Sequence, residues 1–256
     1  MSTADATNGP EPVISTRNGD AAWVTIDRPA LRNALDVRAM KALALHLRAA
    51  ETSDARCIVL TGSSGNFCAG GDVSVLSTQE DYYQYTSSFA EACDAIAGLS
   101  KPLIARVSGR ATAAGMAIVA LSDIAVATQD AVFGTPEITH GMFPMMAMGP
   151  IAAEIGRKAA WRLFYSGELI SGTDALALGL LTEVAADPAD LDARVDQWVR
   201  CIAKADPRPL ALGRQLFHEL LDTPRSEAVR LGGKCVLRLL ALRTSVPPRA
   251  DYLVAE

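Results

Sequence analysis

Three short segments carry residue types that could act on a bound ligand. The first is the loop at residues 62–73, where Ala69-Gly70-Gly71-Asp72 follows the apolar run 57–60. Two adjacent glycines remove side-chain bulk and open backbone torsions, so a ligand can reach main-chain N–H groups, as in phosphate cradles and oxyanion holes. A phosphate loop would continue with Gly-Lys-Ser/Thr, whereas the charge of Asp72 repels phosphate. The residues favour an oxyanion loop, and a structural tight turn fits them equally well.

The second segment runs from Val107 to Asp123 and includes Ala113-Ala114-Gly115 at the expected start of a helix. Small residues in a first helical turn leave unbonded backbone N–H groups within reach of a ligand. The N–H groups of Gly71 and Ala114 could therefore hold a developing oxyanion between them. Close packing of the helix on a sheet explains the small residues equally well.

The third segment, 133–137, ends in Glu137 directly after Pro136. If nearby apolar side chains enclose its carboxylate, loss of water raises the pKa, as a general acid/base requires. The enclosing residues expected from the sequence are Phe133, Met142, Phe143 and Met145. A solvated turn residue beside a helix start is the alternative interpretation of Glu137.

Strands and helices alternate along the part of the chain that must position these segments. Strands are expected at 21–27, 57–60, 103–107, 123–127, 131–134 and 181–184. Helices are expected at 33–50, 79–99, 113–121, around 152–165 and at 173–180, and the chain reads as helical from 187 onward. This order predicts an α/β fold followed by helices.

Composition bounds the possible partners. The 256 residues are 50% hydrophobic with a net charge of -5 and no basic run, which argues against nucleic acid as a partner.

Residues 1–12 are polar, lack a leader pattern and are expected to form a disordered tail. The most apolar window, 111–121, is too short to span a membrane. Five scattered cysteines without metal-ligand or redox spacing favour a reducing cytoplasm and no metal site.

Five segments occur together in the order and spacing of the crotonase, or enoyl-CoA hydratase/isomerase, superfamily, which this chain resembles from about residue 21 to 184. They are R-P-A-L-R-N-A-L (28–35), L-T-G-S-S-G-N-F-C-A-G-G-D (60–72), V-S-G-R-A-T-A-A-G-M-A (107–117), S-D-I-A-V-A (122–127) and F-G-T-P-E (133–137). Each segment alone is a weak signal, whereas five in register are highly specific.

The resemblance implies an enzyme that acts on acyl-CoA thioesters and needs no cofactor beyond the CoA of its substrate. It implies a spiral of ββα repeats over 13–190, and a C-terminal helical region, 191–256, that forms a homotrimer or a hexamer built as a dimer of trimers. The N–H groups of Gly71 and Ala114 would stabilise an enolate, with Glu137 as acid/base. The implied substrate- and CoA-binding residues are Arg32, Ala34, Ala69, Gly70, Asp72, Val73, Gly115 and Pro136, of which Asp72 would orient the loop and cap the next helix.

Departures from the family pattern bear on the reaction. Ala117 stands where two-carboxylate hydratases of this family carry a second Glu. Proton transfer between carbons needs one base, so Ala117 favours double-bond isomerisation or hydration by Glu137 alone, and other enolate chemistry stays open. Met145 to Met148 replace a Gly-rich stretch and predict either an adaptable acyl pocket or ordinary core packing. Residues 242–256 lack the family's usual ending, so no contact to the CoA phosphates is carried over from it.

Weaker candidates complete the set. His140 follows Glu137 by three residues and could approach the site, but a surface or packing role is the simpler interpretation. At least one of Tyr82, Tyr83 and Tyr85 is expected to line the acyl pocket. No motif of a serine hydrolase or a dinucleotide-binding protein is present. Two hypotheses remain: an enoyl-CoA hydratase or isomerase, and a non-catalytic acyl-CoA-binding paralogue motivated by Ala117. Retention of Glu137 favours the enzyme.

Overall fold

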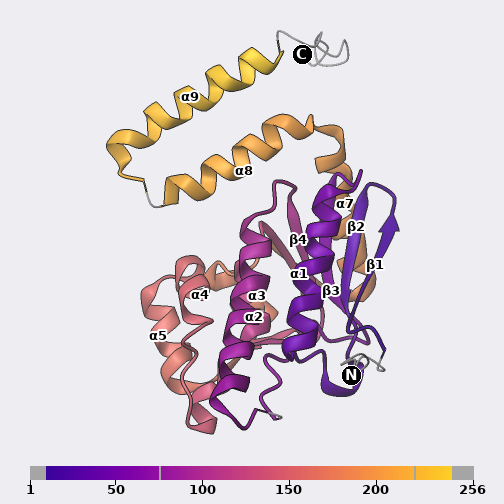
Figure 1. Cartoon of the computed structure of the whole chain (residues 1–256), viewed down its shortest axis with the longest axis vertical. Helices are drawn as coiled ribbons and strands as arrows, with labels where there is room; N and C mark the ends of the chain where they lie inside the picture. The colour runs from indigo at the N-terminus through magenta and orange to yellow at the C-terminus, as the bar shows by residue number, and fades with distance from the viewer. Residues whose placement is uncertain (1–9, 75, 222, 244–256) are drawn as a thin grey trace, which may run out of the picture.

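The computed structural model describes residues 10–74, 76–221 and 223–243 (Figure 1). Most of the tail expected at 1–12 lies outside the described residues, as does the C-terminal stretch 244–256. At residue 12 the chain already belongs to the fold, because the Pro12 carbonyl accepts a hydrogen bond from the Asp27 N–H at 2.8 Å.

A six-stranded sheet forms the centre, in the order β1-β2-β3-β4-β6-β9. Its strands are β1 (Val13–Asn18), β2 (Ala21–Ile26), β3 (Cys57–Gly62), β4 (Leu103–Val107), β6 (Ile124–Thr128) and β9 (Glu183–Ala185). β1 pairs antiparallel with β2, and the other pairs are parallel. β1 is missing from the sequence-based prediction because five of its six residues are exposed, so it has no apolar face to detect.

A second, smaller sheet accompanies the large one. It contains β5 (Arg110–Thr112), β7 (Val132–Gly134) and β8 (Leu169–Ser171), with β7 parallel to β5 and antiparallel to β8. β5 follows β4 after a turn at Gly109, whose φ is +58°, and β7 follows β6 in the same way. β4 and β6 thus each continue into a short strand and then a helical segment, which is the expected ββα repeat.

Helices cover both faces of the large sheet. The described helical segments before residue 205 are η1 (Pro29–Leu31), α1 (Val37–Thr52), α2 (Gln79–Ala97), α3 (Ala114–Ala120), η2 (Pro136–His140), α4 (Met148–Ile155), α5 (Arg157–Ser166), α6 (Gly172–Leu178) and α7 (Pro188–Lys204). The single helix expected around 152–165 is wrong, because Gly156, at a φ of +73°, separates α4 from α5.

Side chains along the buried strands point alternately to the two faces of the large sheet, so the sheet separates two hydrophobic clusters. Ile58 and Leu60 of β3 pack with α1 and α2, whereas Cys57 and Val59 face the opposite side and meet the buried face of α7. That face consists of Leu191, Val195, Val199 and Ile202. The boundary predicted at residue 190 therefore falls inside a helix that is part of the sheet's packing.

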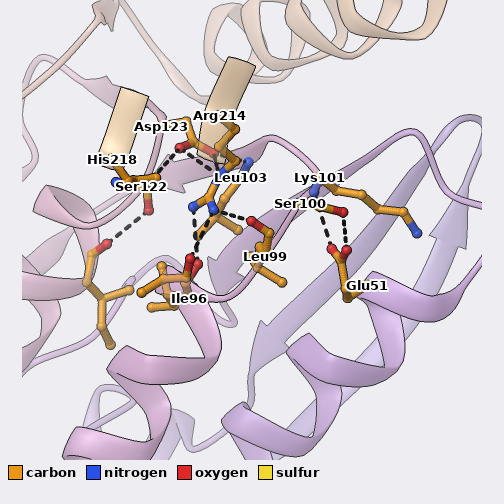
Figure 2. A network of polar contacts seen from close by, with 12 residues as sticks. Glu51, Ile96, Leu99, Ser100, Lys101, Leu103, Ser122, Asp123, Arg214 and His218 are labelled. Carbon is orange, nitrogen blue, oxygen red and sulfur yellow. Dashed lines mark hydrogen bonds and ion pairs between the residues drawn. The ribbon is translucent and has the colours of Figure 1, made fainter. Parts of the chain in front are cut away.

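Two further helices, α8 (Pro207–Leu221) and α9 (Arg225–Arg243), lie beyond one end of the sheet (Figure 1). Arg214 of α8 is nearly buried, and its Nε donates to both carboxylate oxygens of Asp123 at 2.9 and 3.0 Å. Its guanidinium also reaches the carbonyls of Ile96 and Leu99 (Figure 2). This network holds α8 against the ends of α2 and β6.

α9 exposes apolar side chains, among them Val229 at 83% and Leu237 at 68%. Helices without a partner for such residues are typical of subunit contacts. Within the described residues, no helix is long and apolar enough to cross a bilayer.

Candidate active site

The loop that carries the paired glycines is held on one side by the segment before α1. The Leu35 N–H donates to the Gly70 carbonyl, and the Asp72 N–H donates to the Leu35 carbonyl, both at 2.8 Å. In this parallel pairing the bonds to Leu35 come from Gly70 and Asp72, so the N–H and the carbonyl of Gly71 point away from Leu35. The Gly71 N–H has no acceptor in the described part of the chain.

On its other side the loop joins the small sheet. The Cys68 N–H donates to the Arg110 carbonyl at 2.8 Å, and the Thr112 N–H donates to the Cys68 carbonyl at 3.0 Å. The Thr112 hydroxyl also donates to the Ala69 carbonyl at 3.1 Å. The loop is therefore a short strand fixed between two neighbours, which is a rigid support for a binding site.

Close packing explains three of the glycines. A Cβ on Gly70, whose φ is +110°, would lie 2.9 Å from the Ala113 Cβ. A Cβ on Gly115 would lie 2.3 Å from the Cys68 carbonyl oxygen, and one on Gly71 only 1.5 Å from the Tyr85 hydroxyl oxygen. These contacts bring the start of α3 and the side of α2 directly onto the loop.

The first turn of α3 has unbonded N–H groups at this contact. Ala113 has a φ of +52°, and its N–H donates to the Gly134 carbonyl at 2.9 Å. The first hydrogen bond of the helix runs from the Ala117 N–H to the Ala113 carbonyl, and no side chain caps the turn. The Ala114 N–H is thus left without a protein acceptor among the described residues, on the segment packed against Gly70.

Glu137 lies in η2, directly after the small sheet. Its Oε2 atom is buried and has no hydrogen-bond partner in the described part of the chain. Burial raises the pKa of this carboxyl group, while its own backbone N–H and the nearby His140 lower it. A buried oxygen without a partner is costly, so the interpretation of Glu137 as a solvated turn residue is wrong. His140 itself is exposed.

The expected enclosure of Glu137 needs correction. Phe133 is fully buried and Phe143 is partly buried, but Met142 is 51% and Met145 is 75% exposed. The physical reason is the turn at Gly141, with a φ of +74°, after which the chain leaves η2 along the surface. Met148 is partly buried against the large core, which agrees with the packing alternative for that methionine.

One tyrosine of α2 reaches this site. Tyr82 and Tyr83 are exposed, whereas Tyr85 is partly buried with its hydroxyl against Gly71. Burial, and then the charges of Cys68, Glu137 and Asp72, raise the pKa of Tyr85 to about 12. Phe89, four residues further on, is also buried on α2. That helical spacing was the sequence signal that could have singled out Tyr85.

Asp72 orients the loop, but it does not cap α2 as expected. Its Oδ1 accepts from the Ser74 hydroxyl at 2.6 Å, and this bond is the largest cause of its lowered pKa. Its Oδ2 lies 3.4 Å from the Arg28 guanidinium. α2 instead begins at a capping box formed by Thr78 and Asp81, because the chain runs on for several residues before the helix starts.

The other residues implied in CoA binding lie on the segment before α1, on the loop itself and at the start of η2. Arg32 is exposed at a φ of +50°, and its carbonyl accepts from the Ala69 N–H at 3.0 Å. The Ala34 carbonyl accepts from Arg28. Val73 is 42% exposed, and Pro136 is partly buried as the first residue of η2. Arg32, Ala34, Ala69, Gly70 and Asp72 are thus brought together along one edge.

Asn33 is a structural residue of the site that the sequence analysis missed. It is fully buried, and its amide nitrogen donates to the carbonyls of Ser63 and Asn66 at 2.9 and 2.6 Å. Its side-chain oxygen accepts from the Arg28 N–H at 2.8 Å. Asn33 therefore ties both sides of the loop together. Asn33 lies within the family segment 28–35, but its partners are backbone carbonyls thirty or more residues away, which the sequence alone does not identify.

Position 117 contributes no polar group. Ala117 is fully buried in α3, so Glu137 is the carboxylate that the motif positions supply. Within the described residues, no three His, Cys, Asp or Glu side chains are grouped closely enough to hold a metal ion.

Comparisons with known proteins identify the family of the chain. The family described as Enoyl-CoA hydratase/isomerase matches residues 16–234. The chain is 31% identical over 247 residues to enoyl-CoA hydratase domain-containing protein 3, mitochondrial, of Rattus norvegicus, covering 92% of this chain and 81% of that protein. It is 30% identical over 210 residues to 2,3-dehydroadipyl-CoA hydratase of Escherichia coli (strain K12), covering 81% and 82% of the two chains.

Solved structures resemble the whole arrangement. An enoyl-CoA hydratase from Mycobacterium smegmatis superposes with a TM-score of 0.86 at 32% identity, covering 90% of this chain and 91% of that one. The family match includes the glycine loop, the start of α3 and the segment with Glu137. The chain therefore belongs to the enoyl-CoA hydratase/isomerase family, the crotonase superfamily.

Proposed function

We propose that the protein hydrates or isomerises the double bond of an enoyl-CoA, with Glu137 as its acid/base. The observation that carries the proposal is the buried Oε2 of Glu137, which has no protein partner in the described part of the chain. Two N–H groups without acceptors, those of Gly71 and Ala114, lie on neighbouring packed segments. A carboxylate with a free oxygen and two free donors are the parts that enolate chemistry needs.

The two N–H groups would donate to the thioester oxygen and stabilise it as the enolate forms. For isomerisation, Glu137 takes a proton from C2 of a 3-enoyl-CoA and returns it to C4, and the double bond moves into conjugation. For hydration, Glu137 accepts a proton from a water molecule while the water oxygen forms a bond to C3 of the 2-enoyl-CoA. Glu137 then delivers that proton to C2. One carboxylate suffices in either case, which is consistent with Ala117.

The raised pKa of Glu137 supports this role. Its ionised form takes a proton more readily than that of an exposed glutamate, because burial stabilises the neutral form. The implied CoA contacts, Arg32, Ala34, Ala69, Gly70, Asp72, Val73, Gly115 and Pro136, belong to the same proposal. Their support is that most of them share the edge beside Gly71 and Ala114.

The second candidate function is acyl-CoA binding without catalysis. The observation that favours it is the buried alanine at position 117, where a second carboxylate would assist hydration. The unpartnered Glu137 argues against it, because a binding protein gains nothing from a buried charge beside an apolar chain.

Assembly and location belong to the same set of proposals. The exposed apolar side chains of α9 support a homotrimer or a hexamer. Five free cysteines support a reducing compartment, and the cytoplasm is our proposed location. The proposed reactions are redox-neutral and need no cofactor beyond the CoA of the substrate.

The test uses crotonyl-CoA and 3-hexenoyl-CoA with wild type and with Glu137→Gln, following the absorbance of the conjugated thioester and the product masses. Hydration of the first substrate makes the protein a hydratase, and conjugation of the second alone makes it an isomerase. Either activity must fall in Glu137→Gln. If neither substrate reacts and Glu137→Gln binds acyl-CoA more tightly than wild type, the binding function replaces the enzymatic one.

A further inference from the structure

The hydroxyl of Tyr85 lies directly on the glycine whose N–H is proposed to hold the thioester oxygen. A Cβ on Gly71 would be 1.5 Å from the Tyr85 hydroxyl oxygen and 2.7 Å from the ring carbon that bears it. The ring packs against the large core, so the hydroxyl is the part of the side chain aimed at the loop. Only a glycine leaves room for this contact.

The hydroxyl remains a hydrogen-bond donor at neutral pH. The pKa of Tyr85 is raised to about 12, by burial first and then by Cys68, Glu137 and Asp72. The contact with Gly71 places the phenol oxygen on the glycine loop. No hydrogen bond from the Tyr85 hydroxyl is formed to any other residue in the described ranges of the chain.

A purely structural role does not explain this arrangement. A phenylalanine would fill the same volume against the core, so packing alone does not require the hydroxyl, which a bound ligand can reach as a hydrogen-bond donor. Position 117 offers no polar side chain, since Ala117 is buried and apolar. The Tyr85 hydroxyl is therefore a side-chain polar group in direct contact with Gly71.

We propose that Tyr85 is a catalytic residue whose hydroxyl donates a hydrogen bond to the thioester oxygen held by Gly71. It adds a side-chain donor to the two backbone donors as negative charge develops on that oxygen. No proton is transferred, so Tyr85 acts on the enolate while Glu137 moves the protons. This inference rests on the proposed function, because it assigns a third donor to the same oxyanion.

The variants are Tyr85→Phe, which keeps the ring and its packing, and Tyr83→Phe, which makes the same change at an exposed position of the same helix. Loss of a donor to a transition-state oxyanion lowers the rate by roughly 100-fold in comparable sites. Tyr85→Phe should therefore lower kcat by about that factor, with KM within a few-fold of wild type. Tyr83→Phe should leave both constants unchanged.

A spectroscopic readout separates this role from packing. The absorption of cinnamoyl-CoA moves to longer wavelength when its carbonyl oxygen is hydrogen-bonded, and Glu137→Gln provides a background in which the probe is not consumed. We expect a red shift in Glu137→Gln and a clearly smaller one in Glu137→Gln with Tyr85→Phe. An equal red shift in both proteins, or a Tyr85→Phe effect confined to KM, overturns the role of Tyr85.

Failure of the proposed function gives a different result. If wild type turns over no enoyl-CoA and Glu137→Gln shows no red shift with bound cinnamoyl-CoA, the oxyanion hole itself is refuted and the role of Tyr85 with it. A normal red shift in Glu137→Gln, together with no effect of Tyr85→Phe, refutes Tyr85 alone.

Discussion

Gly71 and Tyr85 are in direct contact, with the position of a Gly71 Cβ only 1.5 Å from the tyrosine hydroxyl oxygen. Gly71→Ala must therefore push Tyr85 away from the loop. We expect this variant to lose about 1–3 kcal/mol of unfolding free energy, as overpacked sites do, and to lose activity. Urea unfolding and steady-state kinetics measure the two effects.

Gly213→Ala is the matched control, because no atom lies within 4 Å of the added Cβ in α8. Replacing a glycine inside a helix should leave stability unchanged or raise it. If Gly71→Ala is as stable and as active as Gly213→Ala, the close contact between Gly71 and Tyr85 is refuted.

Removing the charge of Glu137 should stabilise the fold. The folded-state pKa of Glu137 is raised by burial, so the folded protein holds this proton more tightly than the unfolded chain. The stabilisation that protonation gives is complete at acidic pH and is lost as pH rises through the raised folded-state pKa. Glu137→Gln should therefore unfold at a higher temperature than wild type at neutral pH, by the equivalent of about 1 kcal/mol.

The gain should disappear toward acidic pH, where wild-type Glu137 is itself neutral. Thermal unfolding of both proteins across a pH series provides the measurement. A lower melting temperature for Glu137→Gln at neutral pH would mean that hydrogen bonds or charges in the folded protein stabilise the Glu137 carboxylate.

Arg214 should be essential for the attachment of α8. Arg214→Ala leaves Asp123 and the carbonyls of Ile96 and Leu99 without their partner (Figure 2). Breaking a buried ion pair by removing one side costs about 3–5 kcal/mol. Urea unfolding should show that loss, whereas Arg48→Ala, which removes an exposed pair with Glu91, should change little.

Asn33 should control both stability and CoA affinity. Asn33→Ala removes two hydrogen bonds that join the residues before α1 to the loop and a third from the Arg28 N–H, and it leaves buried backbone groups unpaired. We expect a loss of about 2–3 kcal/mol in unfolding free energy and a raised KM for the CoA ester. A variant with normal stability and normal KM would show that the loop keeps its geometry without Asn33.

The fold and most of the site could be predicted because motifs and periodicity carry them. The alternation of β3, β4 and β6 with helices is visible in apolar runs, and the family motifs place Gly71, Ala114 and Glu137. β1 could not be predicted, because a mostly exposed strand is defined by its pairing with β2 rather than by its own pattern.

Tertiary contacts decide the remaining features. The contact of Tyr85 with Gly71 could not be predicted, because helical spacing places Tyr85 on the face of α2 that carries Phe89 but does not say which loop that face meets. Met142 and Met145 were expected around Glu137 from proximity in sequence, but the turn at Gly141 takes them to the surface.

The most direct test of the central claim is the rate of Glu137→Gln on whichever enoyl-CoA the wild type converts. Glutamine keeps the size of the side chain and cannot accept the proton. General acid/base catalysis contributes roughly 10²–10⁴-fold, so kcat should fall by at least about 100-fold while acyl-CoA binding persists. A kcat equal to that of wild type would contradict the assignment of Glu137 as the acid/base.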